Sequence, residues 1–129
     1  MSRRNISSGT KWEPVVGYSR AVRVGPHVHI AGTTAVDASG TIVGRGDAYA
    51  QTAFILKKIE AALIEGGASM SNVVRTRMFV TDITKFDDVG RAHGEVFHAI
   101  RPATTMIEVR ALVDPELIVE IEADAYVEE

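Results

Sequence analysis

The chain lacks three things that would each point to a function. It has no cysteine in 129 residues, which excludes disulfide bonds, thiolate catalysis and cysteine-ligated zinc. No apolar run approaches the ~20 residues that a membrane-spanning helix needs. There is no excess of basic residues: the net charge is −3, which argues against nucleic acid as a partner.

The N-terminal residues, MSRRNISSGTKWEP, carry two arginines but no apolar segment of signal-peptide length after them. We therefore expect a protein of the cytoplasm with no membrane partner. What the chain does contain is 46% apolar and 24% charged residues, the composition of a globular protein. Its length matches one ordinary domain, and without linkers or repeats we expect a single domain over residues 1–129.

The apolar patterning predicts an α+β fold. We expect a hairpin over 21–32, a turn and short strand over 37–44, a helix from an Asp47 N-cap to Gly66-Gly67, a strand over 72–82, a second helix over 84–100 capped by Thr84, and closing strands over 104–110 and 119–125. Two helices cannot cover both faces of so small a sheet, so both should lie on one face of a mixed sheet.

In the two closing strands, apolar and polar residues alternate with a period of two, which raises the question of what the polar face contacts. In this pattern Thr105, Ile107 and Val109 share a face with Val119, Ile121, Ala123 and Ala125, and should point at the helices. The opposite face should collect the charged residues Arg23, Arg75, Arg77, Glu108, Arg110, Glu120, Glu122 and Asp124, with His27 or His29. Such a face can meet water or a partner subunit, and the residues alone leave both open.

No pattern indicates a metal or a cofactor. His27 and His29 share a strand face but have no third ligand at a telling spacing, so we predict no metal site. His93 lies on the apolar stripe of the second helix and is interpreted as a core residue. Gly44 and Gly46 belong neither to a dinucleotide fingerprint nor to a phosphate-binding loop.

Three segments in order resemble the Rid family, also called YjgF or the liver perchloric-acid-soluble proteins. They are VVGYSRAVRVGPHVHIAGTTAVDASGTIV, AYAQTAFILKKIEAALIEGGASMSNVVRTRMFVTDITKFDDV, and the C-terminal pieces RPAT, IEV and VEIEADA. The resemblance implies a chorismate-mutase-like sandwich and a homotrimer whose sheets form a central β-barrel. It also implies clefts between subunits that take a small-molecule ligand. In the best-known branch, water attacks an imine or enamine and releases ammonia and a 2-keto acid.

The resemblance assigns roles to individual residues. Tyr18 would form an aromatic wall, Gly32 would bind the ligand through its backbone, and Thr33 follows where the branch often has Gln. Glu120 would hold and orient the attacking water as the catalytic residue, although a salt bridge to Arg75 or Arg77 is the alternative.

Two positions depart from the branch: Thr104 stands where an arginine should bind the substrate carboxylate, and Gly90 stands where an asparagine is usual. We therefore expect a non-standard substrate or another cation, for which Arg91 is the candidate. Three functions remain open. They are a hydrolase acting on a reactive imine or enamine, a trimeric small-molecule binder or regulator without catalysis, and an endoribonuclease, which the acidic composition favours least.

Overall fold

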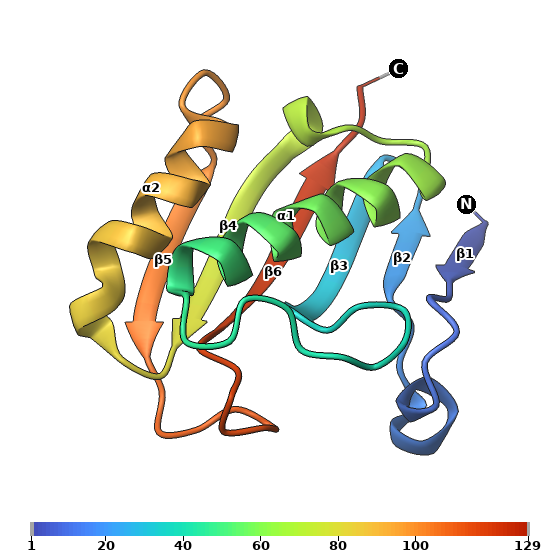
Figure 1. The fold of residues 1–129 in the computed structure, drawn as a ribbon. Helices are drawn as coiled ribbons and strands as arrows, with labels where there is room; N and C mark the ends of the chain where they lie inside the picture. The colour runs from blue at the N-terminus through green and yellow to red at the C-terminus, as the bar shows by residue number, and fades with distance from the viewer. Residues whose placement is uncertain (1, 129) are drawn as a thin grey trace.

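The computed structural model describes residues 2–128 as one six-stranded sheet with two α-helices on one face (Figure 1). The sheet order is β1-β2-β3-β6-β4-β5, and only β4 and β5 are parallel. The strands are β1 (Arg3–Ile6), β2 (Ala21–Val24), β3 (His27–Thr34), β4 (Val73–Val80), β5 (Ala103–Glu108) and β6 (Val119–Tyr126), and the helices are α1 (Ala48–Glu65) and α2 (Phe86–Phe97). The predicted α+β class, with a mixed sheet and both helices on one face, is confirmed.

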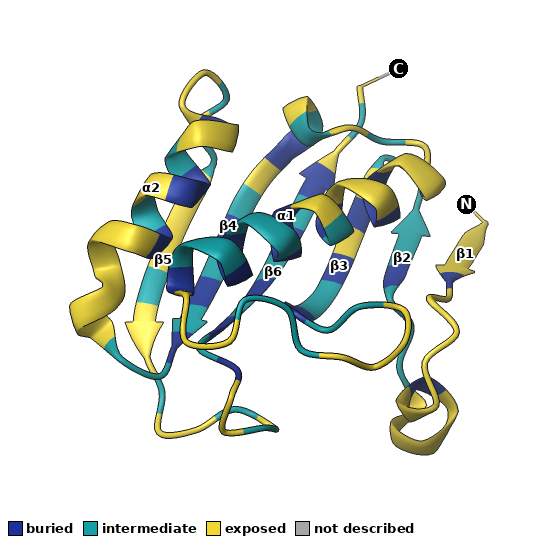
Figure 2. Cartoon of the chain, viewed as in Figure 1, coloured by how far each residue is buried: buried dark blue, intermediate teal, exposed yellow. Residues whose placement is uncertain are grey.

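Helix α1 begins and ends where its sequence signals stand. The Asp47 carboxylate accepts a hydrogen bond from the Ala50 N–H at 3.0 Å, and Gly66-Gly67 follows the last turn. Its buried side packs on the middle strands and builds the core with them (Figure 2). The most deeply buried side chains of this core include Val28, Ile55, Ile59, Leu63, Val119 and Ile121. Neither α1 nor any other helix within residues 2–128 is long and apolar enough to cross a membrane.

Helix α2 starts later than predicted, and its N-cap residue, Lys85, makes no side-chain capping hydrogen bond. A 3₁₀ turn (Ile83–Lys85) precedes it, and the Asp82 carboxylate accepts from both the N–H and the hydroxyl of Thr84. Thr84 therefore donates to the cap of the 3₁₀ turn and does not cap α2, because its hydroxyl is already bound to the acid two residues before it.

The N-terminal strand β1 was not predicted, and the short strand expected over 37–44 reduces to one bridge between Val36 and Ile42. Strand β1 is polar and only Ile6 is buried, so it carries no alternation that a sequence pattern could detect. It forms because β2 offers it an unpaired edge.

The face assigned to the fifth strand is wrong. Strand β5 pairs with β4 and not with β6, and the Thr104 hydroxyl bonds to that of Thr76, a buried residue on the helix side. Thr104 and Glu108 thus lie on the helix side, and Ile107 lies on the open face. The reason is that β5 is an edge strand, exposed on both sides, where polarity does not report the core.

Two charged residues expected on the open face lie on the helix side instead. Arg23 donates to the backbone oxygens of Gly66 and Gly67 at the end of α1, at 2.9 and 3.2 Å. Glu108 accepts from the Ile83 N–H at 3.0 Å. Both side chains satisfy free backbone groups at helix ends, which alternation along a strand cannot foretell.

The open face does carry cross-strand ion pairs. His29 contacts Asp124 at 2.7 Å, and Arg77 contacts Glu122 at 3.1 Å and Asp124 at 3.2 Å. These pairs leave out Glu120, which forms no ion pair within residues 2–128. The proposed salt bridge from Glu120 to Arg75 or Arg77 is therefore absent in this chain.

Candidate functional site

A cavity of about 560 Å³ lies where β6 begins, beside the bend of β3. It brings together Tyr18, Gly32 and Glu120, which the sequence analysis had grouped although they are far apart in the chain. The other lining residues are Trp12, Val16, Arg20, Ala31, Thr34 and Val113. A mostly apolar cavity with a few convergent polar groups is the usual form of a small-molecule site.

The aromatic side of the cavity is built by a short π-helical turn (Glu13–Gly17). The buried Glu13 carboxylate accepts hydrogen bonds from the Ser8 N–H at 3.0 Å and the Ser8 hydroxyl at 2.6 Å. The Tyr18 N–H donates to the Glu13 oxygen at 3.0 Å. These bonds hold the segment so that Trp12 before the turn and Tyr18 after it both line the cavity.

A β-bulge in β3 makes room for the catalytic candidate. Ile30 pairs with Ala123 and Thr33 with Ile121, so two residues, Ala31 and Gly32, oppose one residue of β6. A methyl group at Gly32 would overlap the Glu120 carboxylate, since the Glu120 Cδ would lie only 3.0 Å from it. Glu120 therefore occupies space that exists because residue 32 has no side chain.

The environment of Glu120 raises the pKa of its carboxyl group above the usual value. Burial is the main cause, the charge of Arg20 acts in the opposite direction, and the charge of Glu122 adds to the rise. A carboxylate with a raised pKa and no ion-pair partner is a better proton acceptor than an ordinary surface glutamate.

Arg20 is the lining residue that sequence reasoning missed. Its Nη1 donates to the Gly32 oxygen and the Thr33 hydroxyl, both at 2.9 Å, and its guanidinium lies 5.7 Å from the centre of the Tyr18 ring. A signal was available, because Arg20 follows Tyr18 by two residues and alternate residues of an extended segment share a face.

The remaining predicted site residues lie outside this cavity. The Thr33 hydroxyl is buried and donates to the Ala31 oxygen at 2.8 Å, and Thr34 lines the cavity instead. Thr104 is hydrogen-bonded to Thr76 at 2.8 Å, which in turn contacts His93 Nε2 at 2.9 Å. His93 is buried, as its position on the apolar stripe indicated.

Arg91, the candidate cation, also lies elsewhere in the chain. Its guanidinium stacks 4.0 Å from the ring of Tyr49 in α1 and approaches Asp88 at 3.7 Å. It does not line the cavity that holds Glu120.

A buried glutamine fixes the loop that leads into β6. Gln51 of α1 donates from its side-chain nitrogen to the Glu116 oxygen and accepts from the Ile118 N–H, both at 2.9 Å. Because Ile118 is two residues before Glu120, Gln51 holds the start of the strand against α1 and helps to position the carboxylate.

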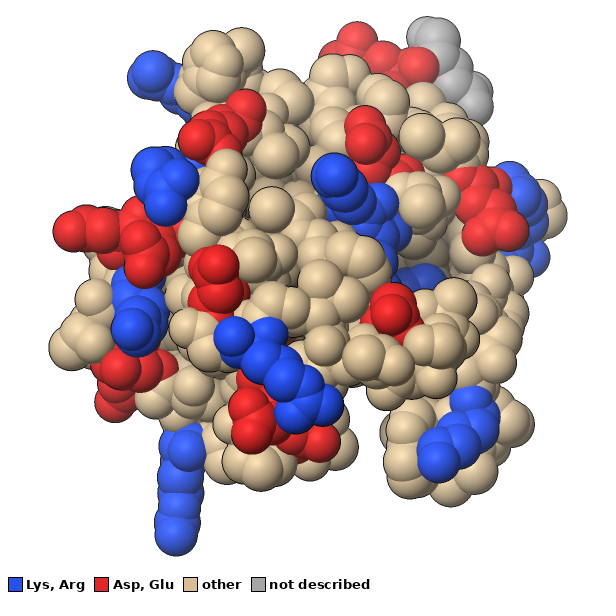
Figure 3. All heavy atoms as spheres, viewed as in Figure 1, with Lys and Arg blue, Asp and Glu red and all other residues tan. Residues whose placement is uncertain are grey.

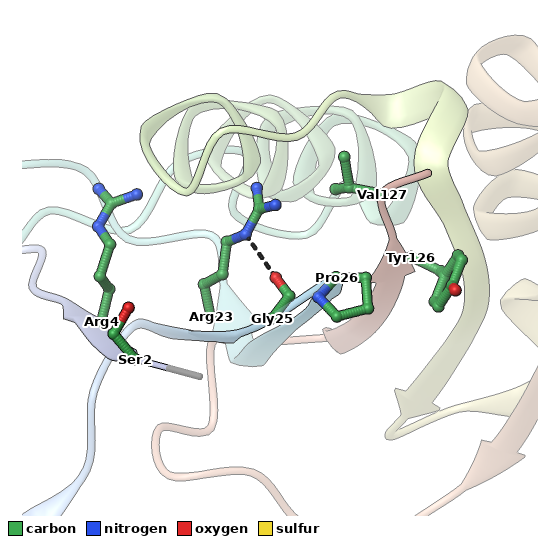
Figure 4. Close-up of a pocket in the computed structure, with 7 residues that line it drawn as sticks. All are labelled: Ser2, Arg4, Arg23, Gly25, Pro26, Tyr126 and Val127. Atoms are coloured by element: carbon green, nitrogen blue, oxygen red, sulfur yellow. Dashed lines mark hydrogen bonds between the residues drawn. The ribbon is translucent and has the colours of Figure 1, made fainter. Parts of the chain in front are cut away.

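A second cavity, of about 520 Å³, lies at the opposite end of β2 and β3 and contains Arg4 and Arg23 (Figure 4). Arg4 donates to the Glu65 oxygen at 3.1 Å, next to the carbonyls that Arg23 binds. Both guanidinium groups thus cap the C-terminus of α1, where unpaired carbonyls favour cations, and this is a structural role.

The helix-bearing face and the histidines give no sign of other ligands within residues 2–128. On the helix-bearing face, basic and acidic side chains are interspersed without a patch of one sign (Figure 3). His27 and His29 stack with ring centres 6.3 Å apart on the open face. Within residues 2–128 no three His, Asp or Glu side chains gather in a way that could hold a metal.

Comparison with known proteins decides the family. The family model described as Endoribonuclease L-PSP, which represents the Rid or YjgF proteins, matches residues 9–127. The chain belongs to the Rid family. The resemblance inferred from the sequence is therefore confirmed over nearly the whole chain.

Three similar proteins show how far the sequence likeness extends. The crystal structure of Rv2704 from Mycobacterium tuberculosis is 52% identical with a TM-score of 0.89, covering 98% of this chain and 100% of that one. The protein SCO2049 of Streptomyces coelicolor is 38% identical, covering 95% of this chain and 91% of its own length. The 3-aminoacrylate deaminase RutC of Acinetobacter baylyi is 30% identical, covering 88% and 90%.

Proposed function

We propose that this Rid-family protein hydrolyses the C=N bond of a small imine, or of the imine formed from an enamine, in the cavity between Tyr18 and Glu120. The observation that carries the proposal is Glu120: a carboxylate with a raised pKa and no ion pair, placed on a cavity wall by the bulge at Gly32. The named activity of the relative RutC, deamination of 3-aminoacrylate, belongs to the same reaction class.

The chemistry needs one proton acceptor and one water. Glu120 accepts a proton from water as the water oxygen attacks the imine carbon, and the electron pair of the C=N bond moves to nitrogen. The proton then passes from Glu120 to that nitrogen, which gives a carbinolamine with an amino and a hydroxyl group on one carbon. The hydroxyl proton next passes to the nitrogen, the C–N bond breaks as the C=O bond forms, and ammonia leaves a carbonyl compound. General-base catalysis of this kind contributes about 10²- to 10⁴-fold in rate.

The test is release of ammonia and keto acid from imines generated in the assay by an amino-acid oxidase, compared with spontaneous hydrolysis. Acceleration by the wild-type protein, saturating with imine concentration, is the expected result. The proposal fails if neither 2-imino acids nor imines without a carboxylate are hydrolysed faster than in buffer. Ligand binding without acceleration would identify the protein as a small-molecule binder instead. An RNA-cleaving function gains no support from the mixed charge of the helix-bearing face.

We also propose that the chain works as a homotrimer, with the open sheet faces turned to one another. Ile107 supports this: it is an apolar side chain, 45% exposed, on the open face and opposite Phe79 of the next strand. Phe79 in turn pairs with Glu120, so the two apolar residues Ile107 and Phe79 border the candidate site. Burial between subunits would remove these side chains from water and enclose the cavity further.

Ile107→Glu should convert the trimer into a folded monomer of 13.9 kDa, because a carboxylate cannot be buried unpaired in a subunit interface. Sedimentation velocity measures the mass, and circular dichroism checks the fold. The control is Ile64→Glu on α1, which is 62% exposed on the opposite side and should leave the trimer intact. A wild-type protein that stays monomeric at micromolar concentration would contradict the trimer.

A further inference from the structure

Two opposite charges line the same cavity without forming an ion pair with each other. Arg20 and Glu120 both line it, and within residues 2–128 neither forms an ion pair with any side chain. Elsewhere on the sheet acids and bases do pair across strands, as Arg77 does with Glu122. The separation of Arg20 from Glu120 therefore leaves space in the cavity that borders a cation on one side and a proton acceptor on the other.

Within residues 2–128, only one nitrogen of the Arg20 guanidinium, Nη1, donates hydrogen bonds. Nη1 donates to the Gly32 oxygen and the Thr33 hydroxyl at 2.9 Å, with a longer contact of 3.4 Å to the Ala31 oxygen. Its Nε and Nη2 make no hydrogen bond to any residue from 2 to 128. A guanidinium has five N–H donors in a planar fork, and its free edge matches the two oxygens of a carboxylate.

Arg20 lies near a second cation, Lys58, and near two acids, Asp37 and Glu120. Lys58 of α1 donates to the Thr34 and Val36 oxygens at 2.7 and 2.8 Å, and burial, followed by the charge of Arg20, lowers the pKa of Lys58 to about 8. Lys58 is thus mainly cationic at neutral pH. The acid near it, Asp37, already accepts hydrogen bonds from Ser39 and Thr41. Neither acid forms an ion pair with Arg20 within residues 2–128, so the free edge of its guanidinium can bind the carboxylate of a ligand.

We propose that Arg20 is the specificity-determining residue of the cavity and binds the carboxylate of a small 2-imino or enamino acid. Gly32 links the two halves of this arrangement: its oxygen holds the guanidinium, and its missing side chain leaves space for Glu120. With the carboxylate on Arg20, the imine carbon points towards Glu120. The assignment of an imino acid rests on the proposed function, but binding of a carboxylate by Arg20 is testable without turnover.

The test measures binding of pyruvate, a 2-keto acid, against methyl pyruvate, its uncharged ester. Trp12 lines the cavity and is the only tryptophan, so its fluorescence reports occupancy. The wild type should prefer pyruvate. Arg20→Gln should weaken pyruvate binding about ten- to a hundred-fold by loss of a bidentate charge-assisted contact, with little effect on the ester. Arg20→Lys, which keeps the charge, should retain part of the preference, and Arg45→Gln, an exposed arginine outside the cavity, should change nothing.

A second measurement concerns the pH dependence of hydrolysis. The charge of Arg20 lowers the pKa of Glu120, whereas burial and Glu122 raise it. In Arg20→Gln the acidic limb of the kcat/KM profile should therefore move to higher pH, which reports that the Arg20 charge acts on Glu120. The loss of preference for pyruvate over its ester is the result that a purely structural role of Arg20 would not cause.

Three results would overturn the proposal. They are a wild type with no affinity for pyruvate, an Arg20→Gln variant that keeps its preference for pyruvate over the ester, and loss of pyruvate binding in Arg91→Gln but not in Arg20→Gln. A protein that binds pyruvate through Arg20 but hydrolyses no imine would refute the hydrolase and leave this inference standing. A protein that hydrolyses uncharged imines but does not bind pyruvate would support the hydrolase and refute the role of Arg20.

Discussion

Glu120→Gln should reduce imine hydrolysis by about 10²- to 10⁴-fold while leaving the fold and the assembly intact, because the amide cannot accept a proton from water. The substitution is nearly isosteric and breaks no ion pair within residues 2–128. The measurements are kcat/KM for an imine, sedimentation velocity and the melting temperature of the same variant. Loss of activity that is accompanied by loss of the trimer would show a structural role instead.

The melting temperature of Glu120→Gln also has an expected pH dependence. The folded pKa of Glu120 is raised, so its contribution to stability is fully present below the ordinary value of 4.5 and is lost as the pH rises through the folded pKa. At neutral pH the variant should therefore melt at the same temperature as the wild type or higher, and the difference should shrink as the pH falls towards 4.5.

Glu122→Gln is the matched control on the same strand. Glu122 is paired with Arg77 on the open face. Its loss leaves Arg77 with Asp124 alone, so it should affect stability or assembly more than the chemical step. If both glutamine variants lose activity equally, Glu120 has no special role.

Gly32→Ala should be nearly as damaging as the loss of Glu120 itself, although it adds only one methyl group. The new Cβ would overlap the Glu120 carboxylate and force it to move. A shift of about 1 Å in a catalytic group costs on the order of 10²-fold in rate. The backbone at Gly32 does not need glycine for its conformation, as its φ is not positive, so the variant should fold. Steady-state kinetics together with the melting temperature separate misplacement from unfolding.

The control for Gly32→Ala is Gly90→Ala in α2, where an added Cβ meets nothing within 4 Å. Alanine favours a helix over glycine by about 0.8–1 kcal/mol, so this variant should be as active and at least as stable as the wild type. The double variant Gly32→Ala with Glu120→Gln should be no less active than Glu120→Gln alone. Full activity in Gly32→Ala would mean that the reaction does not use Glu120 in this position.

Much of the fold could be predicted because local rules sufficed for it. The ends of α1 followed from Asp47 and the Gly66-Gly67 pair, and the faces of β6 followed from strict alternation in a strand buried on one side. The likeness of three segments to the Rid family also identified Tyr18, Gly32 and Glu120 as a group, which the structure places around one cavity.

Other features depended on contacts between distant parts of the chain. Strand β5 lies at an edge, parallel to β4, so its polarity did not tell which face would meet the helices. Thr104 and Arg91 were reasonable candidates by position, but hydrogen bonding to Thr76 and stacking on Tyr49 place them away from Glu120 within the chain.

The amino-acid sequence by itself determined the two helices, since these depend on residue type and spacing along the chain. Its resemblance to the Rid family supplied the family and the identity of the candidate catalytic acid. Only the tertiary structure decided which cation shares the cavity. Arg20 lies beside Gly32 because a bulge in β3 presents carbonyl oxygens to its guanidinium, and Glu120 fits there because β6 runs next to that bulge. This placement of Arg20 and Glu120 depends on strand register. Register is set by the pairing of distant strands across the sheet, so it cannot be read from any single segment of the sequence.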